Sequence, residues 1–194
     1  MTVNKVLTQL AKSGLVERRR KAGTFVTRPR VQSAVLEIND IKTEVAALGL
    51  PYRYEIVFRH IRKPVPADRE VFGQKATGPI LEIICHHFAG PLPFCVEERI
   101  INLKAVPEAR DEKFNLNSPG PWLVGKVPWS SAEHRIRAVS ANVAIASALR
   151  ISEGNACLII ERKTFNAEMP ITFVRLIYPG QEHELIAHFT PPRG

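Results

Sequence analysis

Residues 156–178, ACLIIERKTFNAEMPITFVRLIY, decide the fold class of this chain. Ala156–Phe165 and Ile171–Tyr178 are rich in β-branched and aromatic residues, which is typical of strands. Asn166–Pro170 between them contains turn-forming residues and is too short for a crossover between parallel strands. This stretch therefore predicts a long antiparallel hairpin.

A second hairpin is expected at Ile80–Phe88 and Leu92–Ile101, which flank the turn sequence Ala89-Gly90-Pro91. Shorter strands are expected at Tyr54–Ile61, Glu133–Val139 and Glu184–Phe189. Helices are expected at Ile38–Leu48, Ala67–Phe72 and Ala141–Leu149, and residues 107–128, rich in Pro, Gly and Asn, are expected to wind irregularly. Sequential hairpins with few helices predict an antiparallel sheet, and therefore an α+β domain over residues 38–192.

The overall composition fits a soluble protein with a packed core. The chain has 194 residues, of which 45% are hydrophobic and 24% charged. It has no apolar run near the roughly 20 residues of a membrane span, and no apolar signal-peptide core at its start. Cys85, Cys95 and Cys157 are an odd number without CxxC spacing, which favours buried reduced thiols. We expect a cytoplasmic protein that does not bind a membrane.

The positive charge is concentrated at the start of the chain. Residues 1–30 hold eight Lys and Arg side chains against one Glu, a net +7, which leaves +1 of the total +8 for all other residues. Clustered cations gain affinity for nucleic acid by releasing its condensed counterions. A solvated basic tail is the alternative explanation.

The pattern within residues 1–30 predicts a helix followed by a hairpin. Apolar residues recur at helical spacing over residues 2–12, and Gly14 can end that helix. Leu15–Arg20 and Thr24–Thr27 are then expected as two short strands. Residues expected to contact double-stranded DNA are Thr2, Asn4, Lys5 and Thr8 on the helix, and Arg18, Arg19, Arg20, Lys21 and Gly23 on the hairpin.

Residues 1–26, MTVNKVLTQLAKSGLVERRRKAGTFV, resemble the recognition helix and wing of the winged helix-turn-helix domain in GntR-family transcription regulators. The resemblance implies that residues 1–30 are the C-terminal part of that domain and that residues 31–37 are a linker. The family has two further helices and a strand ahead of this point. We therefore expect this chain to bind an operator only if that N-terminal part is supplied.

The rest of the chain resembles UTRA, an effector-binding domain with the chorismate-lyase-like fold that follows the DNA-binding domain in one GntR subfamily. The segments that carry this resemblance are PFCVEERIIN (93–102), RAVSANVAIASALRISEGNACLIIERKTF (137–165) and PITFVRLIYPG (170–180). VPWSSAEHRIRA (127–138) and VRLIYPG (174–180) are similar to the histidine-utilisation repressors of that subfamily. The similarity implies a homodimeric repressor of histidine-degradation genes that urocanate releases from DNA.

The resemblance also implies a pocket lined by the middle strand pair and the penultimate strand. Urocanate joins a planar imidazole to an acrylate, so its site needs a cation and an imidazole partner. The candidates are His87, Glu97, Arg99, Arg175 and Tyr178, with Trp129, Ser130 and His134 from the PWSSAEH segment. Alternatives remain open: Arg99 in a surface pair, Arg175 exposed on its strand, Tyr178 closing a turn and His134 in a structural role. Arg162 is assigned to a structural role because it lies in a strand away from these segments.

Catalytic and metal-binding arrangements are not expected. His86 and His87 are adjacent on a strand and so point to opposite faces. Ser130, Glu133 and His134 crowd one segment, whereas a Ser-His-acid set is assembled from separate elements. We expect no metal, no cofactor and no enzyme activity. Two alternatives to the repressor remain, a free-standing effector-binding module without specific DNA binding and a chorismate-lyase-like enzyme.

Overall fold

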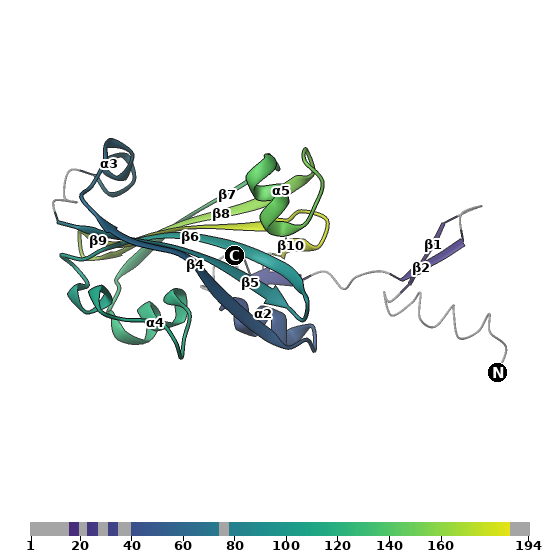
Figure 1. Ribbon diagram of the computed structural model, residues 1–194, viewed down its shortest axis with the longest axis horizontal. Coiled ribbons are helices and arrows are strands. Elements are labelled where there is room, and N and C mark those ends of the chain that lie inside the picture. The colour runs from purple at the N-terminus through teal and green to yellow at the C-terminus, as the bar shows by residue number, and fades with distance from the viewer. Residues whose placement is uncertain (1–15, 20–22, 27–30, 35–39, 74–77, 187–194) are drawn as a thin grey trace, which may run out of the picture.

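A computed structural model describes residues 16–19, 23–26, 31–34, 40–73 and 78–186. Its centre is a six-stranded sheet in which every neighbouring pair is antiparallel (Figure 1). In spatial order the strands are β4 (Tyr52–Arg62), β5 (Ile80–Ala89), β6 (Leu92–Asn102), β9 (Met169–Pro179), β8 (Ala156–Asn166) and β7 (Ser131–Ser140). The β5–β6 and β8–β9 pairs confirm the two predicted hairpins, and the α+β class is confirmed with them.

Helices cover both faces of this sheet. α2 (Ile41–Ala47) and α4 (Pro119–Lys126) lie on one face, called here the α2/α4 face, and α3 (Pro66–Phe72) and α5 (Val143–Leu149) lie on the α3/α5 face (Figure 1). Each helix buries an apolar stripe on the sheet, and these contacts build the core. Val45 of α2 packs in one cluster with Val174 and Leu176 of β9, whereas Leu149 of α5 packs with Ile159 and Ile177.

Residues 107–128 are more regular than predicted. They contain a short 3-10 helix, Pro107–Arg110, as well as α4. Pro119 and Pro121 fall in the first turn of α4, where the backbone N–H groups have no partner within the helix, so proline is tolerated there. Buried Leu123 holds the helix on the sheet. The expectation of an irregular segment is therefore wrong for these eight residues.

Two small strand pairs accompany the sheet. β1 (Val16–Arg19) pairs with β2 (Gly23–Val26), which confirms the predicted hairpin within residues 1–30, called here the basic head. β3 (Val31–Ala34) pairs in parallel with β10 (His183–Ile186), although residues 31–37 were expected to form a linker.

Arg18, Arg19 and Gly23, three of the residues expected to contact DNA, fall within β1 and β2. The predicted helix over residues 2–12, and the expected DNA contacts Thr2, Asn4, Lys5, Thr8, Arg20 and Lys21, lie outside the described residues. So does the end of the last expected strand, beyond residue 186.

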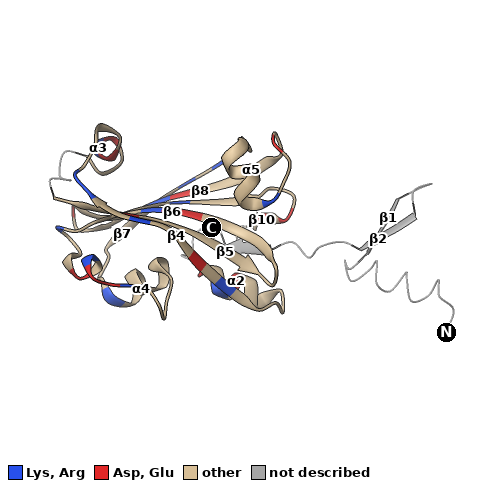
Figure 2. Ribbon diagram, viewed as in Figure 1, with Lys and Arg blue, Asp and Glu red and all other residues tan. Residues whose placement is uncertain are grey.

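Charged residues lie inside the strands of the sheet as well as in its connections (Figure 2). Strand residues alternate between faces, so neighbours such as Glu97 and Glu98 belong to opposite sides. The charged strand residues therefore form two separate clusters, one on each face.

No helix in the described part of the chain is long and apolar enough to cross a membrane.

Candidate ligand-binding site

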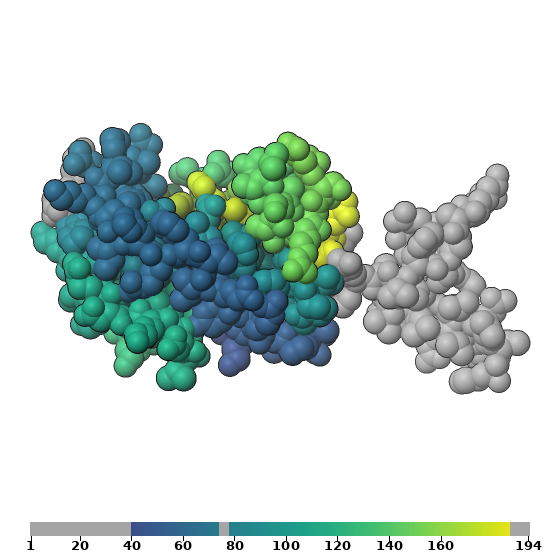
Figure 3. All heavy atoms as spheres, in the orientation of Figure 1, coloured from purple at the N-terminus to yellow at the C-terminus, as the bar shows by residue number. Residues whose placement is uncertain are grey.

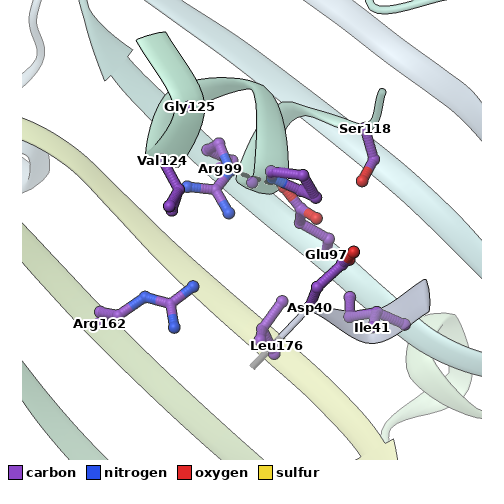
Figure 4. Close-up of a pocket in the computed structure, with 11 residues that line it drawn as sticks. Asp40, Ile41, Glu97, Arg99, Ser118, Val124, Gly125, Arg162 and Leu176 are labelled. Atoms are coloured by element: carbon purple, nitrogen blue, oxygen red, sulfur yellow. Dashed lines mark hydrogen bonds and ion pairs between the residues drawn. The ribbon is translucent and has the colours of Figure 1, made fainter. Parts of the chain in front are cut away.

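A cavity of about 240 Å³ lies on the α2/α4 face, where the beginning of α2 and the body of α4 meet the sheet (Figure 4). Its floor is formed by strands β6, β8 and β9. The residues that line it are Asp40, Ile41, Glu97, Arg99, Ser118, Gly120, Pro121, Val124, Gly125, Arg162 and Leu176. The cavity suits a ligand smaller than a drug-sized molecule, for which sites start at about 300 Å³.

Two arginines on the cavity floor are aligned by the strand register. Arg99 of β6 and Arg162 of β8 are both paired with Val174 of β9, the strand between them. Residues directly opposite each other point to the same face of a sheet. Both guanidinium groups therefore reach the same side, one strand apart on each side of Val174.

Arg99 is fixed by hydrogen bonds to neighbouring side chains. Its Nε donates to Oε1 of Glu97 at 2.5 Å, and one Nη donates to the Thr172 hydroxyl at 3.2 Å. The other carboxylate oxygen of Glu97 lies 3.0 Å from Nε2 of His87, whose Nδ1 lies 2.8 Å from the Tyr52 hydroxyl. Since an ionised carboxylate only accepts, Nε2 of His87 carries a proton and donates it to Glu97.

Glu97 is ionised in this network. Burial opposes ionisation, but the charge of Arg99 and the hydrogen bonds from His87 and Arg99 outweigh it and lower the pKa of Glu97 to about 2. The carboxylate is only 2% exposed. Glu97 is therefore the counter-ion of Arg99 at every pH near neutrality.

Arg162 has no such partner. Its side chain points into the cavity (Figure 4) and is 7% exposed, yet it forms no hydrogen bond or ion pair with any residue that the structure describes. Burial, followed by repulsion from Arg99, lowers its pKa to about 10, so the guanidinium remains charged near neutrality. A buried unpaired cation is costly, and an anion in the cavity would remove that cost.

The other side of the cavity offers acceptors and close backbone. Asp40 is the N-cap of α2, and its carboxylate accepts from the N–H of Lys42 at 3.1 Å. Gly120 of α4 approaches Arg99 so closely that an added Cβ would lie 3.2 Å from Nη2 of that arginine. The cavity thus has a cationic floor and a carboxylate and the Ser118 hydroxyl at its rim.

The structure brings several of the sequence candidates together. Glu97 and Arg99 line the cavity, and His87 lies behind Glu97 as its hydrogen-bond partner. Trp129 lines a smaller hollow beside the cavity, and Arg99 and Arg162 border both. The period-two alternation of β6 had placed Glu97 and Arg99 on one face, as observed.

Arg175, expected as the cation for a carboxylate, lies on the opposite face of the sheet. On the α3/α5 face it bonds Glu98 and Glu161, each at 3.1 Å. Arg137 also donates from an Nη to Oε1 of Glu161, at 2.6 Å. The backbone layer of the sheet separates the two faces, so Arg175 does not line this cavity.

Three other candidates also lie outside the cavity lining. The buried Tyr178 hydroxyl donates to Glu44 of α2 at 3.4 Å, and its ring stacks on His183 at 3.9 Å. The Ser130 hydroxyl donates to the carbonyl of Phe165 and accepts from the N–H of Ala167, which fastens the ends of β7 and β8 together. His134 lies on β7, opposite Arg162 in the register and next to the cavity wall.

Arg162 itself was missed by the sequence reasoning, which placed it away from the site. The signal that could have found it is the alternation of β8, which puts Arg162 on the same face as buried Ile160 and Thr164. A charged residue on a face that is otherwise buried needs a partner. Asp40 and Ser118 were missed as well, because they are N-cap residues of α2 and α4 and carry no such pattern.

Sequence and structure comparisons agree on one relationship. The UTRA domain profile matches residues 47–184. A histidine utilization repressor from Pseudomonas putida is 30% identical over 191 residues, 98% of this chain and 77% of that protein. The crystal structure of the C-terminal domain of a histidine utilization repressor from Pseudomonas syringae pv. tomato has a TM-score of 0.67 at 25% identity, covering 72% of this chain and 99% of that one. PhnF from Mycobacterium smegmatis, with a TM-score of 0.81 at 18% identity over 97% of this chain and 84% of that one, has the same fold.

Proposed function

Since this chain belongs to the UTRA-domain family and is a GntR-type transcriptional regulator rather than an enzyme, we propose that it represses histidine-degradation genes and is released from DNA by urocanate or a related imidazole acid. The assignment of the target genes is supported by the relatives that are named histidine utilization repressors. The cavity on the α2/α4 face is the proposed effector site. The double-stranded operator is the proposed partner of the basic head, in a homodimer.

The observation that carries the effector proposal is the buried Arg162 guanidinium, which has no counter-ion among the described residues. Arg99 already holds Glu97, so the site has one positive charge in excess on its floor. A monoanionic carboxylate bound there would accept from Arg162 and from the remaining Nη2 donor of Arg99. Such charge-assisted bonds contribute about 1.5–3 kcal/mol each.

The imidazole end of urocanate matches the other side of the cavity. An imidazole N–H can donate to the Asp40 carboxylate or to the Ser118 hydroxyl, and both residues line the cavity. The planar ring would lie between Val124 of α4 and Leu176 of β9, which supply apolar contact. A ligand with a carboxylate at one end and a hydrogen-bond donor at the other is thus the best chemical fit.

Ligand binding can reach the DNA-binding head through α2. Asp40 and Ile41, at the start of α2, line the cavity, and β3 precedes this helix in the chain. A ligand that contacts Asp40 favours one arrangement of this end of α2 over others. By linkage, the arrangement that binds urocanate better is the one that binds the operator less well.

Isothermal titration calorimetry of the chain with urocanate tests this proposal. We expect saturable binding, and weaker binding of cinnamate, which keeps the acrylate and replaces the imidazole by phenyl. Absence of heat and of any thermal shift at millimolar urocanate would contradict the effector assignment.

A mobility-shift assay with the operator region of a histidine-degradation operon tests the DNA half. Dissociation of a specific complex by urocanate is the expected result for the protein that carries the complete DNA-binding domain. Urocanate binding without any specific DNA complex would instead favour a free-standing effector-binding module.

A further inference from the structure

Tyr52, at the start of the edge strand β4, is hydrogen-bonded to two parts of the candidate site, although it is not among the described residues that line the cavity. Its hydroxyl lies 2.8 Å from Nδ1 of His87 and is also hydrogen-bonded to the side chain of Ser118. The other ring nitrogen of His87 bonds Glu97 on the cavity floor, whereas Ser118 lies at the cavity rim (Figure 4). One hydroxyl group thus connects the rim of the cavity with its floor.

The Ser118 hydroxyl bonds Tyr52 instead of capping its own helix. Ser118 is the N-cap of α4, a position at which a serine side chain usually accepts from backbone N–H groups of the first turn. In the described structure its side chain makes no such capping bond. Two of the first three residues of α4, Pro119 and Pro121, have no N–H to donate. The hydrogen bond with Tyr52 therefore orients the Ser118 hydroxyl in place of a helix cap.

The branch from Tyr52 to the floor is buried and stacked. The rings of Tyr52 and Tyr54 lie nearly parallel with centroids 6.1 Å apart, and the His87 ring lies 6.0 and 5.9 Å from them. His87 is 0% exposed, and Glu97 bonds Arg99 through its second carboxylate oxygen. In a buried chain of hydrogen bonds each group is oriented by the next one. The orientation of the Arg99 guanidinium therefore depends on the Tyr52 hydroxyl.

We propose that Tyr52 is a positioning residue of the effector site, which holds the Ser118 hydroxyl at the rim and the Arg99 guanidinium on the floor in one fixed arrangement. This inference rests on the proposed function, in which an imidazole N–H donates to the rim and a carboxylate accepts on the floor. A ligand that contacts both groups gains affinity from their fixed separation, because neither side chain has to be ordered on binding. Tyr52 therefore favours a ligand with the length and the two end groups of urocanate over a carboxylate that bonds only the floor.

Tyr54 supplies a matched control for Tyr52. It lies two residues further along β4, on the same face, and its hydroxyl donates to the backbone carbonyl of Phe114. The described lining of the cavity includes neither Tyr54 nor Phe114. Tyr54→Phe thus removes the same atom as Tyr52→Phe, from the same strand, without breaking a bond to a residue of the site.

Calorimetric titration of the full 194-residue chain with urocanate and with cinnamate tests the branch to the rim. Tyr52→Phe is expected to lower the ratio of the two affinities about fivefold, the contribution of one hydrogen bond, because cinnamate has no N–H to donate to Ser118. Ser118→Ala is expected to lower the ratio by a similar factor, and Tyr52→Phe to cause no further loss in that background. Tyr54→Phe is expected to leave the ratio unchanged, whatever its effect on stability.

The Nε–H resonance of Arg99 in a proton–nitrogen correlation NMR spectrum tests the branch to the floor without any ligand. We expect Tyr52→Phe to shift this resonance, because His87 then holds Glu97 less firmly, and Tyr54→Phe to leave it in place. An unchanged affinity ratio or an unchanged resonance in Tyr52→Phe would overturn the proposal, and so would equal changes in Tyr54→Phe. If the unchanged chain bound no urocanate, the proposed effector would fail, and the resonance alone would decide whether Tyr52 positions Arg99.

Discussion

The two charged clusters of this protein lie on opposite faces of the same strands, and they differ in what their arginines contact. On the α3/α5 face, Arg175 lies between Glu98 and Glu161 and is 37% exposed in its side chain. On the α2/α4 face, Arg99 and Arg162 are both buried, and among the described residues Arg99 is paired with Glu97 whereas Arg162 has no carboxylate partner. One cluster is neutralised within the sheet, and the other retains a positive charge beside a cavity.

This difference identifies the ligand site better than charge alone does. The α3/α5 face also has a cleft of about 310 Å³ beside α3, and Figure 3 shows α3 and α5 standing apart on that side. Of the arginines that line this cleft, Arg62 and Arg175 are each already paired with two carboxylates, and Arg99 is paired with Glu97. An anionic ligand therefore gains less binding free energy in the larger cleft, where the arginines are already paired, than in the smaller cavity, where a cation is unpaired.

The largest expected effect comes from removing the carboxylate of Glu97, the counter-ion of Arg99. Glu97→Gln leaves Arg99 buried without a counter-ion and next to Arg162, so the free energy of unfolding should fall by about 3–5 kcal/mol. Glu98→Gln, the neighbouring residue on the other face, should cost less than about 1 kcal/mol because its pair is solvent-screened. Urea denaturation of both variants measures the contrast. Equal losses would mean that the two clusters do not differ in the way described.

Acid titration sharpens the same contrast. The pKa of Glu97 is lowered from 4.5 to about 2 in the folded protein, so its contribution is fully present above pH 4.5 and is lost as the pH falls toward 2. The stability advantage of the unchanged chain over Glu97→Gln should therefore shrink by about 3 kcal/mol across this range. Denaturation curves at a series of pH values test this, and a constant difference would contradict the assignment.

A smaller effect is expected at the two glycines of α4 that line the cavity. Gly125→Ala meets no atom within 4 Å and should stabilise the protein by about 0.5–1 kcal/mol through helix propensity. Gly120→Ala should lose that gain and weaken urocanate binding, because its Cβ would lie 3.2 Å from Arg99 Nη2. Thermal unfolding and calorimetry of the pair measure both effects. Equal stabilisation by both substitutions would mean that α4 is not held closely over Arg99.

The sheet was predictable from sequence because its signal is local. Alternating apolar residues and short turns fixed both hairpins, and the spacing of Glu97 and Arg99 placed them on one face. β3 was missed because its partner, β10, lies about 150 residues further along the chain, so no local pattern marks the pair. α4 was missed because its prolines and glycines indicate a loop unless their position in the first turn is known.

The arginines of the site show why its residues were only partly predictable. Arg162 and Arg175 lie in neighbouring strands of one hairpin, and the residues next to each of them in the sequence do not say which arginine faces the cavity. Their roles depend on the pairing of β8 with β9 and of β9 with β6, which sets Arg162 level with Arg99 and Arg175 level with Glu98 and Glu161. Register between distant strands is a property of the folded sheet.

The central claim is that Arg162, and not Arg175, binds the carboxylate of the effector. Calorimetric titration of urocanate into matched Arg162→Met and Arg175→Met variants tests it directly, since methionine keeps side-chain volume and removes the charge. We predict that Arg162→Met weakens binding about 10–100-fold, the loss of a charge-assisted hydrogen bond, whereas Arg175→Met leaves the affinity unchanged. Undiminished binding by Arg162→Met, or an equal loss in both variants, would contradict the account.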